Sequence, residues 1–218
     1  MSGELASRAR WDLYVITDER LSGRPHEEQA RAALAGGAGI IQLRDKAATT
    51  RRLYEAALAL REMTRAAGAL LIINDRVDVA LAADADGVHV GPDDLPVAVA
   101  RRLLPGRIVG ASAGTVEEAV AAERDGADYL GVGAIYEARG SKADAGPPVG
   151  PERIAQIRAA VRLPIVGIGG IKAANAAPVI AAGADGVAVI TGVVAAPDIT
   201  AAARELLAVV QAARRAPR

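Results

Sequence analysis

The sequence predicts an α/β protein built as one (β/α)8 barrel, also called a TIM barrel. Short β-rich runs alternate with longer Ala-rich amphipathic stretches, eight such pairs follow one another, and no linker divides the 218 residues. A barrel of this kind has about 250 residues and sometimes only about 200, so the length fits a single domain. A doubly wound open sheet is the competing fold, but the even spacing and the lack of a dominant first Gly-rich loop favour the barrel.

The predicted elements cover most of the chain. Strands are expected at 13–17, 39–43, 69–74, 87–90, 108–112, 129–132, 165–168 and 186–190. Helices are expected at 26–36, 50–67, 76–83, 95–103, 115–125, 151–160, 173–182 and 198–213. The single domain then spans 1–218, with 1–12 as an N-terminal extension and 214–218 as a frayed tail.

A turn recurs where a predicted helix leads into a strand. It reads Ala-Asp-Gly-Val at 85–88 and 184–187 and Ala-Asp-Tyr-Leu at 127–130. Gly126 and Gly183 stand where a helix would end in a left-handed cap, which is ordinary turn chemistry. The repeat therefore supports the architecture and carries no information on function.

Composition and charge limit the classes of function. Lys plus Arg and Asp plus Glu each number 26, so a net charge of zero gives no attraction to nucleic acid or to an anionic membrane. The absence of Cys excludes disulfides, thiolate metal sites and Cys nucleophiles. We expect no signal peptide at 1–10, and no apolar run approaches the ~18 residues of a membrane span. The expected protein is soluble and cytoplasmic, with small molecules as partners. The sequence leaves open whether the protein forms a homo-oligomer.

Polar side chains gather at the predicted carboxyl ends of the strands, where a (β/α)8 barrel builds its active site. The second strand ends in Gln42-Leu43-Arg44-Asp45-Lys46, and alternation directs Gln42, Arg44 and Lys46 to one side. A cluster of solvated loop charges is the alternative.

Two carboxylates are expected on adjacent strands. Asp75 follows the third strand and Asp94 lies in the loop after the fourth. Mg²⁺ prefers a few carboxylates together with substrate phosphate oxygens, so this pair beside Arg and Lys predicts a site for Mg²⁺ and a diphosphate. Asn74 or Asp75 taken alone would equally well cap the next helix.

Glycines at the last two strands predict a second phosphate site. Gly169 and Gly170 follow the seventh strand, and Gly192 follows the eighth. Glycines let backbone N–H groups approach a phosphate closely, and the loops after strands 7 and 8 are the usual phosphate site of such barrels. The loop 134–150 is a candidate lid, with a flexible solvent loop as the alternative.

The two histidines are not expected to be catalytic. His26 is expected on the surface before the first helix, and His89 alternates within the fourth strand. No arrangement of Ser, His and Asp at a known spacing indicates nucleophilic catalysis.

Several short motifs, taken together, resemble one known family. They are YVITD at 14–18, QLRDK at 42–46, NDR at 74–76, GVHVG at 87–91, GIGGI at 167–171 and GADGV at 183–187. The combination resembles thiamine-phosphate synthase, also called thiamine-phosphate pyrophosphorylase, from about 13 to 193. Members of this family join hydroxymethylpyrimidine diphosphate to hydroxyethylthiazole phosphate, release diphosphate and require Mg²⁺.

The resemblance implies a role for residues in each motif. The residues implied at the pyrimidine diphosphate are Gln42, Arg44, Lys46, Asn74 and Ser112, with Leu43 and Asp45 inside the same binding motif. Asp75 and Asp94 are implied as Mg²⁺ ligands, and Lys142 as a further diphosphate contact. The residues implied at the thiazole phosphate are Gly170, Ile190 and Thr191. The catalytic roles then belong to Arg44, Lys46, Ser112 and Lys142.

One stretch departs from the family pattern. The family usually has two threonines just before the lysine after strand 6, whereas residues 136–142 read YEARGSK. Ser141 supplies one hydroxyl there, and Ala138 does not supply the other.

Two other functions remain alternatives at the level of sequence. One is a thiazole tautomerase of the sister family, and the other is a non-catalytic barrel that binds thiamine precursors. The tautomerases use a histidine in regions where this chain has Ala113 and Ala134, and they lack the acidic metal pair. Retention of Asp75, Asp94, Arg44 and Lys142 argues against both alternatives.

Overall fold

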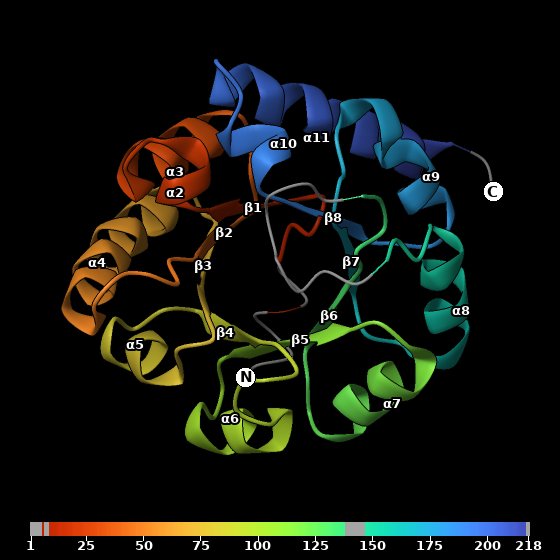
Figure 1. Ribbon diagram of the computed structural model, residues 1–218, viewed down its shortest axis with the longest axis horizontal. Helices are drawn as coiled ribbons and strands as arrows, with labels where there is room; N and C mark the ends of the chain where they lie inside the picture. The colour runs from red at the N-terminus through yellow and green to blue at the C-terminus, as the bar shows by residue number, and fades with distance from the viewer. Residues whose placement is uncertain (1–5, 7–8, 138–146, 217–218) are drawn as a thin grey trace.

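Eight parallel strands close into a barrel in sequence order, and this confirms the predicted fold (Figure 1). The structure is a computed structural model that describes residue 6, residues 9–137 and residues 147–216. The strands are β1 (Leu13–Thr17), β2 (Ile40–Leu43), β3 (Leu70–Asn74), β4 (Gly87–Val90), β5 (Ile108–Ala113), β6 (Tyr129–Val132), β7 (Ile165–Ile168) and β8 (Gly186–Val189). The barrel closes between β8 and β1, where Leu13 pairs with Val187.

Helices form an outer ring around the strands (Figure 1). They are α3 (His26–Ala35), α4 (Thr50–Ala66), α5 (Val77–Ala82), α6 (Val97–Leu103), α7 (Val116–Arg124), α8 (Glu152–Ala160), α9 (Ala176–Ala181) with the 3₁₀ turn η1 (Ala173–Asn175) before it, and α11 (Ile199–Arg215). Two further helices, α2 (Glu19–Ser22) and α10 (Thr191–Val194), have no counterpart in the prediction, because four residues are too few to show a helical period. Within the described residues, no helix is long and apolar enough to cross a membrane.

The last helix extends into the segment predicted to be a frayed tail. Arg214 and Arg215 belong to α11, so the prediction is wrong for these two residues. Arg214 Nη1 donates to Asp12 Oδ1 at 2.7 Å, and this contact ties α11 to the segment before β1. Residues 217 and 218 lie outside the described part of the chain.

Three aspartates of the recurring turn join neighbouring strands at the amino-terminal end of the barrel. Asp86, Asp128 and Asp185 accept backbone N–H hydrogen bonds from the starts of β3, β5 and β7, at 2.7, 2.8 and 2.8 Å. Each carboxylate also forms an ion pair with an arginine from the helix that leads into that strand; these arginines are Arg61, Arg101 and Arg158. The turn is therefore structural, as the sequence predicted.

Two tyrosines fill the centre of the barrel. Tyr14 on β1 and Tyr129 on β6 are fully buried, with their hydroxyl oxygens 2.8 Å apart. Gly110 on β5 makes room for the second ring, because a Cβ at this position would lie 2.1 Å from Tyr129 Cζ. The tyrosine pair forms the floor on which the pocket described below rests.

Candidate active site

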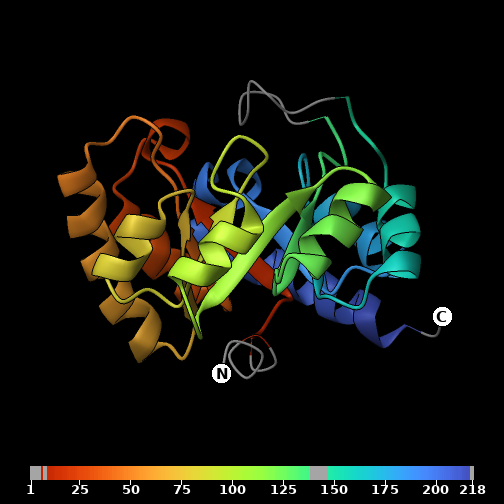
Figure 2. The ribbon, with the colours of Figure 1, turned by 90° about the horizontal axis from the view of Figure 1, so that it is seen from below.

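A pocket lies above the tyrosine pair at the carboxyl ends of the strands. Every strand of the barrel, or the residue just after it, contributes to its wall: Tyr14, Ile16, Gln42, Arg44, Asn74, His89, Ser112, Tyr129, Gly131, Val166, Ile168, Ala188 and Ile190. Figure 2 views the barrel from the side and shows the yellow-green loop after β4 rising above the helices at this end. Five residues predicted from sequence line the pocket, namely Gln42, Arg44, Asn74, Ser112 and Ile190.

A chain of hydrogen bonds crosses the pocket floor. Gln42 Nε2 donates to the Tyr14 hydroxyl at 2.6 Å, and Tyr14 contacts Tyr129. His89 Nδ1 lies 2.9 Å from the Tyr129 hydroxyl, and His89 Nε2 lies 3.0 Å from Ser112 Oγ. Burial raises the pKa of both tyrosines, so both hydroxyls keep their protons.

The direction of this chain determines what Ser112 can offer a ligand. Gln42 donates to the Tyr14 hydroxyl oxygen, so the single Tyr14 proton is available for another acceptor. Both tyrosine protons are used if Tyr14 donates to Tyr129 and Tyr129 donates to His89 Nδ1. His89 then carries its proton on Nε2 and donates it to Ser112 Oγ. In this assignment the Ser112 hydroxyl proton would be available to donate into the pocket.

Arg44 is the buried cation of the pocket wall. Its Nη1 donates to the carboxylate of Asp18, and the side chains of Arg44 and Asp18 are only 10% and 5% exposed. Asp18 is held in turn as the N-cap of α2, where its Oδ1 accepts from Leu21 N at 3.1 Å. Arg44 Nε is buried and has no hydrogen-bond partner among the described residues. Because the Arg44 side chain lines the pocket, its guanidinium is in position to donate to an anion there.

Asp75 and Asp94 face each other at the rim, as expected for residues that follow adjacent strands. Asp94 Oδ2 accepts from Gly91 N at 2.8 Å, and Lys46 Nζ donates to Asp75 Oδ2 at 2.5 Å. Burial, together with a hydrogen bond and charge repulsion from Asp75, raises the pKa of Asp94, while Lys46 opposes the rise. Two adjacent carboxylates that repel one another are a donor set that suits a divalent cation.

The glycines after β7 approach neighbouring backbone closely. Gly170 has a φ of 65°, and a Cβ at this position would lie 2.7 Å from the carbonyl oxygen of Glu137. Asn175 Nδ2 donates to the Gly170 carbonyl at 3.0 Å and holds this turn. Ile190 lines the pocket, while Thr191 is exposed at the first position of α10.

Two residues of the predicted binding motif point away from the pocket. Leu43 is completely buried in the core, and Asp45 faces His26. Alternation along β2 explains both, because residues 43 and 45 project to the side opposite residues 42 and 44. Lys46 stands at the rim, with its side chain 61% exposed. Ser141 and Lys142 lie outside the described residues, as does most of the candidate lid.

Three hydrogen-bonding side chains of the pocket are absent from the site predicted by the sequence. Tyr14 and Tyr129 form the floor, and His89 contacts Ser112. Alternation along β1, β6 and β4 places these side chains inside the barrel and could have indicated a role in the pocket. The hydrogen-bond partner of each side chain lies on a different strand, which the sequence does not show. His26 was also misjudged, since it is 2% exposed rather than on the surface.

Comparison with known proteins identifies the family. A family model described as thiamine monophosphate synthase matches residues 13–193. The chain belongs to this family. Among synthases of the family, the thiamine-phosphate synthase of Moorella thermoacetica is 60% identical over 207 residues, which are 94% of this chain and 98% of that protein. The thiamine-phosphate synthase of Chloroflexus aurantiacus is 58% identical over 201 residues, which are 92% of this chain and 93% of that protein.

A solved structure of the synthase family has the same fold. Thiamine phosphate pyrophosphorylase from Pyrococcus furiosus superposes with a TM-score of 0.88 at 46% identity, covering 95% of this chain and 98% of that one. The family resemblance drawn from the motifs is therefore confirmed over nearly the whole chain.

Proposed function

We propose that this chain is a thiamine-phosphate synthase, which joins hydroxymethylpyrimidine diphosphate to hydroxyethylthiazole phosphate. The observation that carries the proposal is the placement of the buried Arg44 in the wall of a pocket whose rim holds the facing carboxylates of Asp75 and Asp94. Such a combination suits an anionic ligand that arrives with a divalent cation, as a diphosphate does.

The reaction breaks the bond between the pyrimidinyl methylene carbon and the diphosphate oxygen, and the electron pair leaves with diphosphate. The electron-rich aminopyrimidine stabilises the methylene cation, and the thiazole nitrogen uses its lone pair to form the new C–N bond. No proton has to be removed by the protein. Catalysis then depends on positioning and electrostatics, in which one preorganised donor contributes roughly 2.7–4 kcal/mol to lowering the barrier.

The diphosphate would bind between the pocket and the rim. Arg44 would donate to phosphate oxygens from a fixed position, because Asp18 holds its guanidinium. Lys46 is already at the rim and would turn from Asp75 toward the diphosphate. Mg²⁺ held by Asp75 and Asp94 would neutralise charge on the leaving diphosphate. Lys142 is proposed as a further cation for the same group.

The pyrimidine would lie over the tyrosine floor. Gln42 and Asn74 present amides to its ring and substituents, and Ser112 presents a hydroxyl that His89 positions. Val166 and Ile168 supply an apolar wall on the opposite side of the barrel. That wall would keep water away from the methylene cation, which water would otherwise convert to the alcohol.

The thiazole phosphate would bind at the ends of β7 and β8. Gly170 has no side chain of its own to block a phosphate from the backbone N–H groups of this turn, and Ile190 faces the pocket. Thr191 would contribute its hydroxyl. This arrangement would place the thiazole nitrogen beside the reacting methylene group.

The test is an assay of the purified protein with both substrates and Mg²⁺. We expect thiamine phosphate and diphosphate in equal amounts, and neither product when one substrate is omitted. Tautomerisation of a thiazole substrate without the pyrimidine, or binding of both substrates without turnover, would instead support the tautomerase or the non-catalytic barrel. Heat-inactivated protein provides the background rate.

A further inference from the structure

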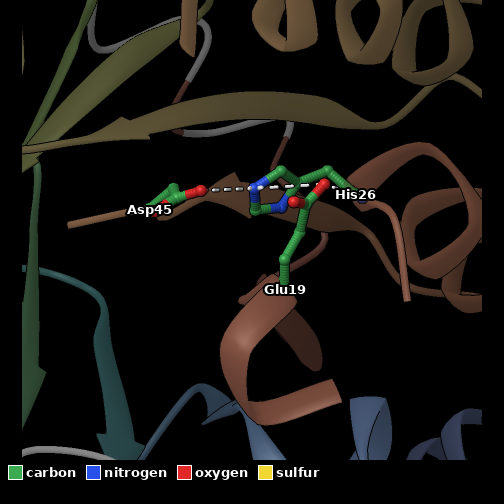
Figure 3. Close-up of side chains that lie close together, drawn as sticks. All are labelled: Glu19, His26 and Asp45. Carbon is green, nitrogen blue, oxygen red and sulfur yellow. Dashed lines mark hydrogen bonds and ion pairs between the residues drawn. The ribbon is translucent and has the colours of Figure 1, made fainter. Parts of the chain in front are cut away.

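A second cluster of metal-ligating side chains lies in the segments that follow β1 and β2 (Figure 3). Glu19 in α2, His26 at the start of α3 and Asp45 after β2 each offer one ligand atom, and these atoms all lie within 4.8 Å of one another. His26 Nε2 is 3.6 Å from Asp45 Oδ2 and 4.0 Å from Glu19 Oε1. The cluster is separate from the Asp75 and Asp94 pair and has no role in the reaction described above.

The histidine of this cluster is buried and aimed at the two carboxylates. Its side chain is 3% exposed, and Nε2 has no hydrogen-bond partner among the residues that the structure describes. Nδ1 lies 2.9 Å from Thr17 Oγ1, and the Thr17 hydroxyl donates to the carbonyl of Gln42 at 3.3 Å. The Thr17 oxygen therefore accepts from Nδ1–H. Nε2 is then left facing two carboxylates, an arrangement that is favourable only with a cation, either a proton or a metal ion, between them.

The surroundings of the histidine match those of a metal ligand. Histidines that bind metals donate their other ring N–H to a neighbouring acceptor, which fixes the tautomer and the ring orientation. Thr17 Oγ1 is that acceptor here. In a tetrahedral Zn²⁺ site with bonds of about 2.0–2.2 Å, the ligand atoms lie about 3.3–3.6 Å apart. The separations of 3.6 and 4.0 Å from Nε2 need only small side-chain rotations to reach this range.

The two carboxylates are oriented by other contacts. Asp45 Oδ1 accepts from the backbone N–H groups of Ala47 and Ala48 at 2.9 and 3.0 Å, which leaves Oδ2 to face His26. Glu19 Oε1 accepts from the backbone N–H of His26 at 3.2 Å and lies 3.4 Å from Arg52 Nη2. The Arg52 side chain is 53% exposed, so it can move into solvent when a cation binds.

We propose that Glu19, His26 and Asp45 form a second divalent-cation site that binds Zn²⁺ or Co²⁺ in preference to Mg²⁺. One imidazole and two carboxylates suit a borderline transition ion, whereas Mg²⁺ prefers oxygen ligands. Two negative charges and a neutral imidazole balance a divalent ion, and a water molecule completes four-coordination. The bound ion would link the segments that follow β1 and β2, and these segments carry the ion pair between Asp18 and Arg44.

The experiment is a Co²⁺ titration of the metal-free protein in a large excess of Mg²⁺, which keeps the Asp75 and Asp94 pair occupied. We expect one equivalent of Co²⁺ to bind with the strong visible absorption of four-coordinate cobalt, and Zn²⁺ to displace it. Zn²⁺ should also raise the unfolding temperature in the same buffer. The absence of saturable Co²⁺ binding under these conditions would overturn the proposal.

Variants locate the ion. His26→Asn keeps a polar nitrogen or oxygen near the position of Nδ1 and removes Nε2, so it should weaken Co²⁺ binding at least tenfold and abolish the effect of Zn²⁺ on unfolding. The chain has two histidines, and His89→Asn is the matched control that should bind Co²⁺ as wild type does. If His26→Asn does not fold, Glu19→Gln is compared with Glu28→Gln, an exposed residue of α3. Unchanged Co²⁺ affinity in the folded site variant would place the ion elsewhere and refute the assignment.

Discussion

Replacing Arg44 with methionine separates the structural role of its ion pair from its proposed role in catalysis. The side chains of Arg44 and Asp18 are 10% and 5% exposed, so the variant leaves a buried carboxylate without its cation. Removal of one partner of a buried pair costs about 3–5 kcal/mol. Asp18 retains its hydrogen bond from Leu21 N at 3.1 Å, so the cost belongs near the lower limit. About 3 kcal/mol corresponds to a fall in Tm of roughly 6–12 °C for a domain of this size.

The effect of Arg44→Met on activity has a different origin. Loss of one preorganised donor to the departing charge costs about 2.7 kcal/mol or more in the barrier, so kcat/KM should fall at least about 100-fold. The double variant Asp18→Asn with Arg44→Met removes the unpaired carboxylate as well. It should recover most of the lost Tm and none of the lost kcat/KM.

Thermal unfolding followed by circular dichroism and steady-state assays with both substrates measure the two effects. Arg51→Met, an exposed position in α4, is the matched control and should change neither quantity. A Tm within about 2 °C of wild type in Arg44→Met would refute the reasoning about the buried pair. Recovery of activity together with Tm in the double variant would show that Arg44 acts only through the fold.

Three further predictions concern the metal pair, the thiazole phosphate and the candidate lid. Because the pKa of Asp94 is raised, the folded state binds its proton more tightly than the unfolded state, and stability falls as pH rises through that pKa when divalent ions are absent. Asp94→Asn should therefore raise Tm slightly in EDTA at pH 7, on the order of 1–2 °C, while turnover is lost. Gly170→Val should weaken binding of the thiazole phosphate more than that of the pyrimidine diphosphate, because a branched side chain would collide with Glu137 backbone at a φ of 65°. Lys142→Ala should slow the chemical step in single-turnover experiments with both substrates saturating.

Each of these predictions has its own contrary result. Asp93→Asn, at the exposed neighbouring position, is the control for Asp94→Asn, and near-normal turnover in Asp94→Asn at low Mg²⁺ would refute the metal assignment. Equal weakening of both substrates by Gly170→Val would show that the two halves of the site are misplaced. A single-turnover rate for Lys142→Ala within about threefold of wild type, less than ~0.7 kcal/mol of barrier, would exclude a role in the departure of diphosphate.

The sequence by itself determined the barrel and much of the pocket, because both follow from local patterns. Short strands alternate with amphipathic helices, and parallel strands place their carboxyl ends at the same edge. Gln42, Arg44, Asn74 and Ser112 could therefore be assigned to the pocket from their positions at or near strand ends. Alternation along β2 also predicts that Leu43 and Asp45 point away from Gln42 and Arg44, so the motif does not enter the pocket as a whole.

Only the tertiary structure decided which distant side chains meet. Tyr14 and Tyr129 are 115 positions apart, and their contact depends on the space that Gly110 leaves. His26 looked like a surface residue because its own helix gives no reason to bury it. His26 is covered by Thr17 at the end of β1 and by Asp45 after β2. These two residues come close to His26 only when β1 and β2 pair. Burial and ligand geometry are properties of contacts between segments, and a pattern within one segment does not contain them.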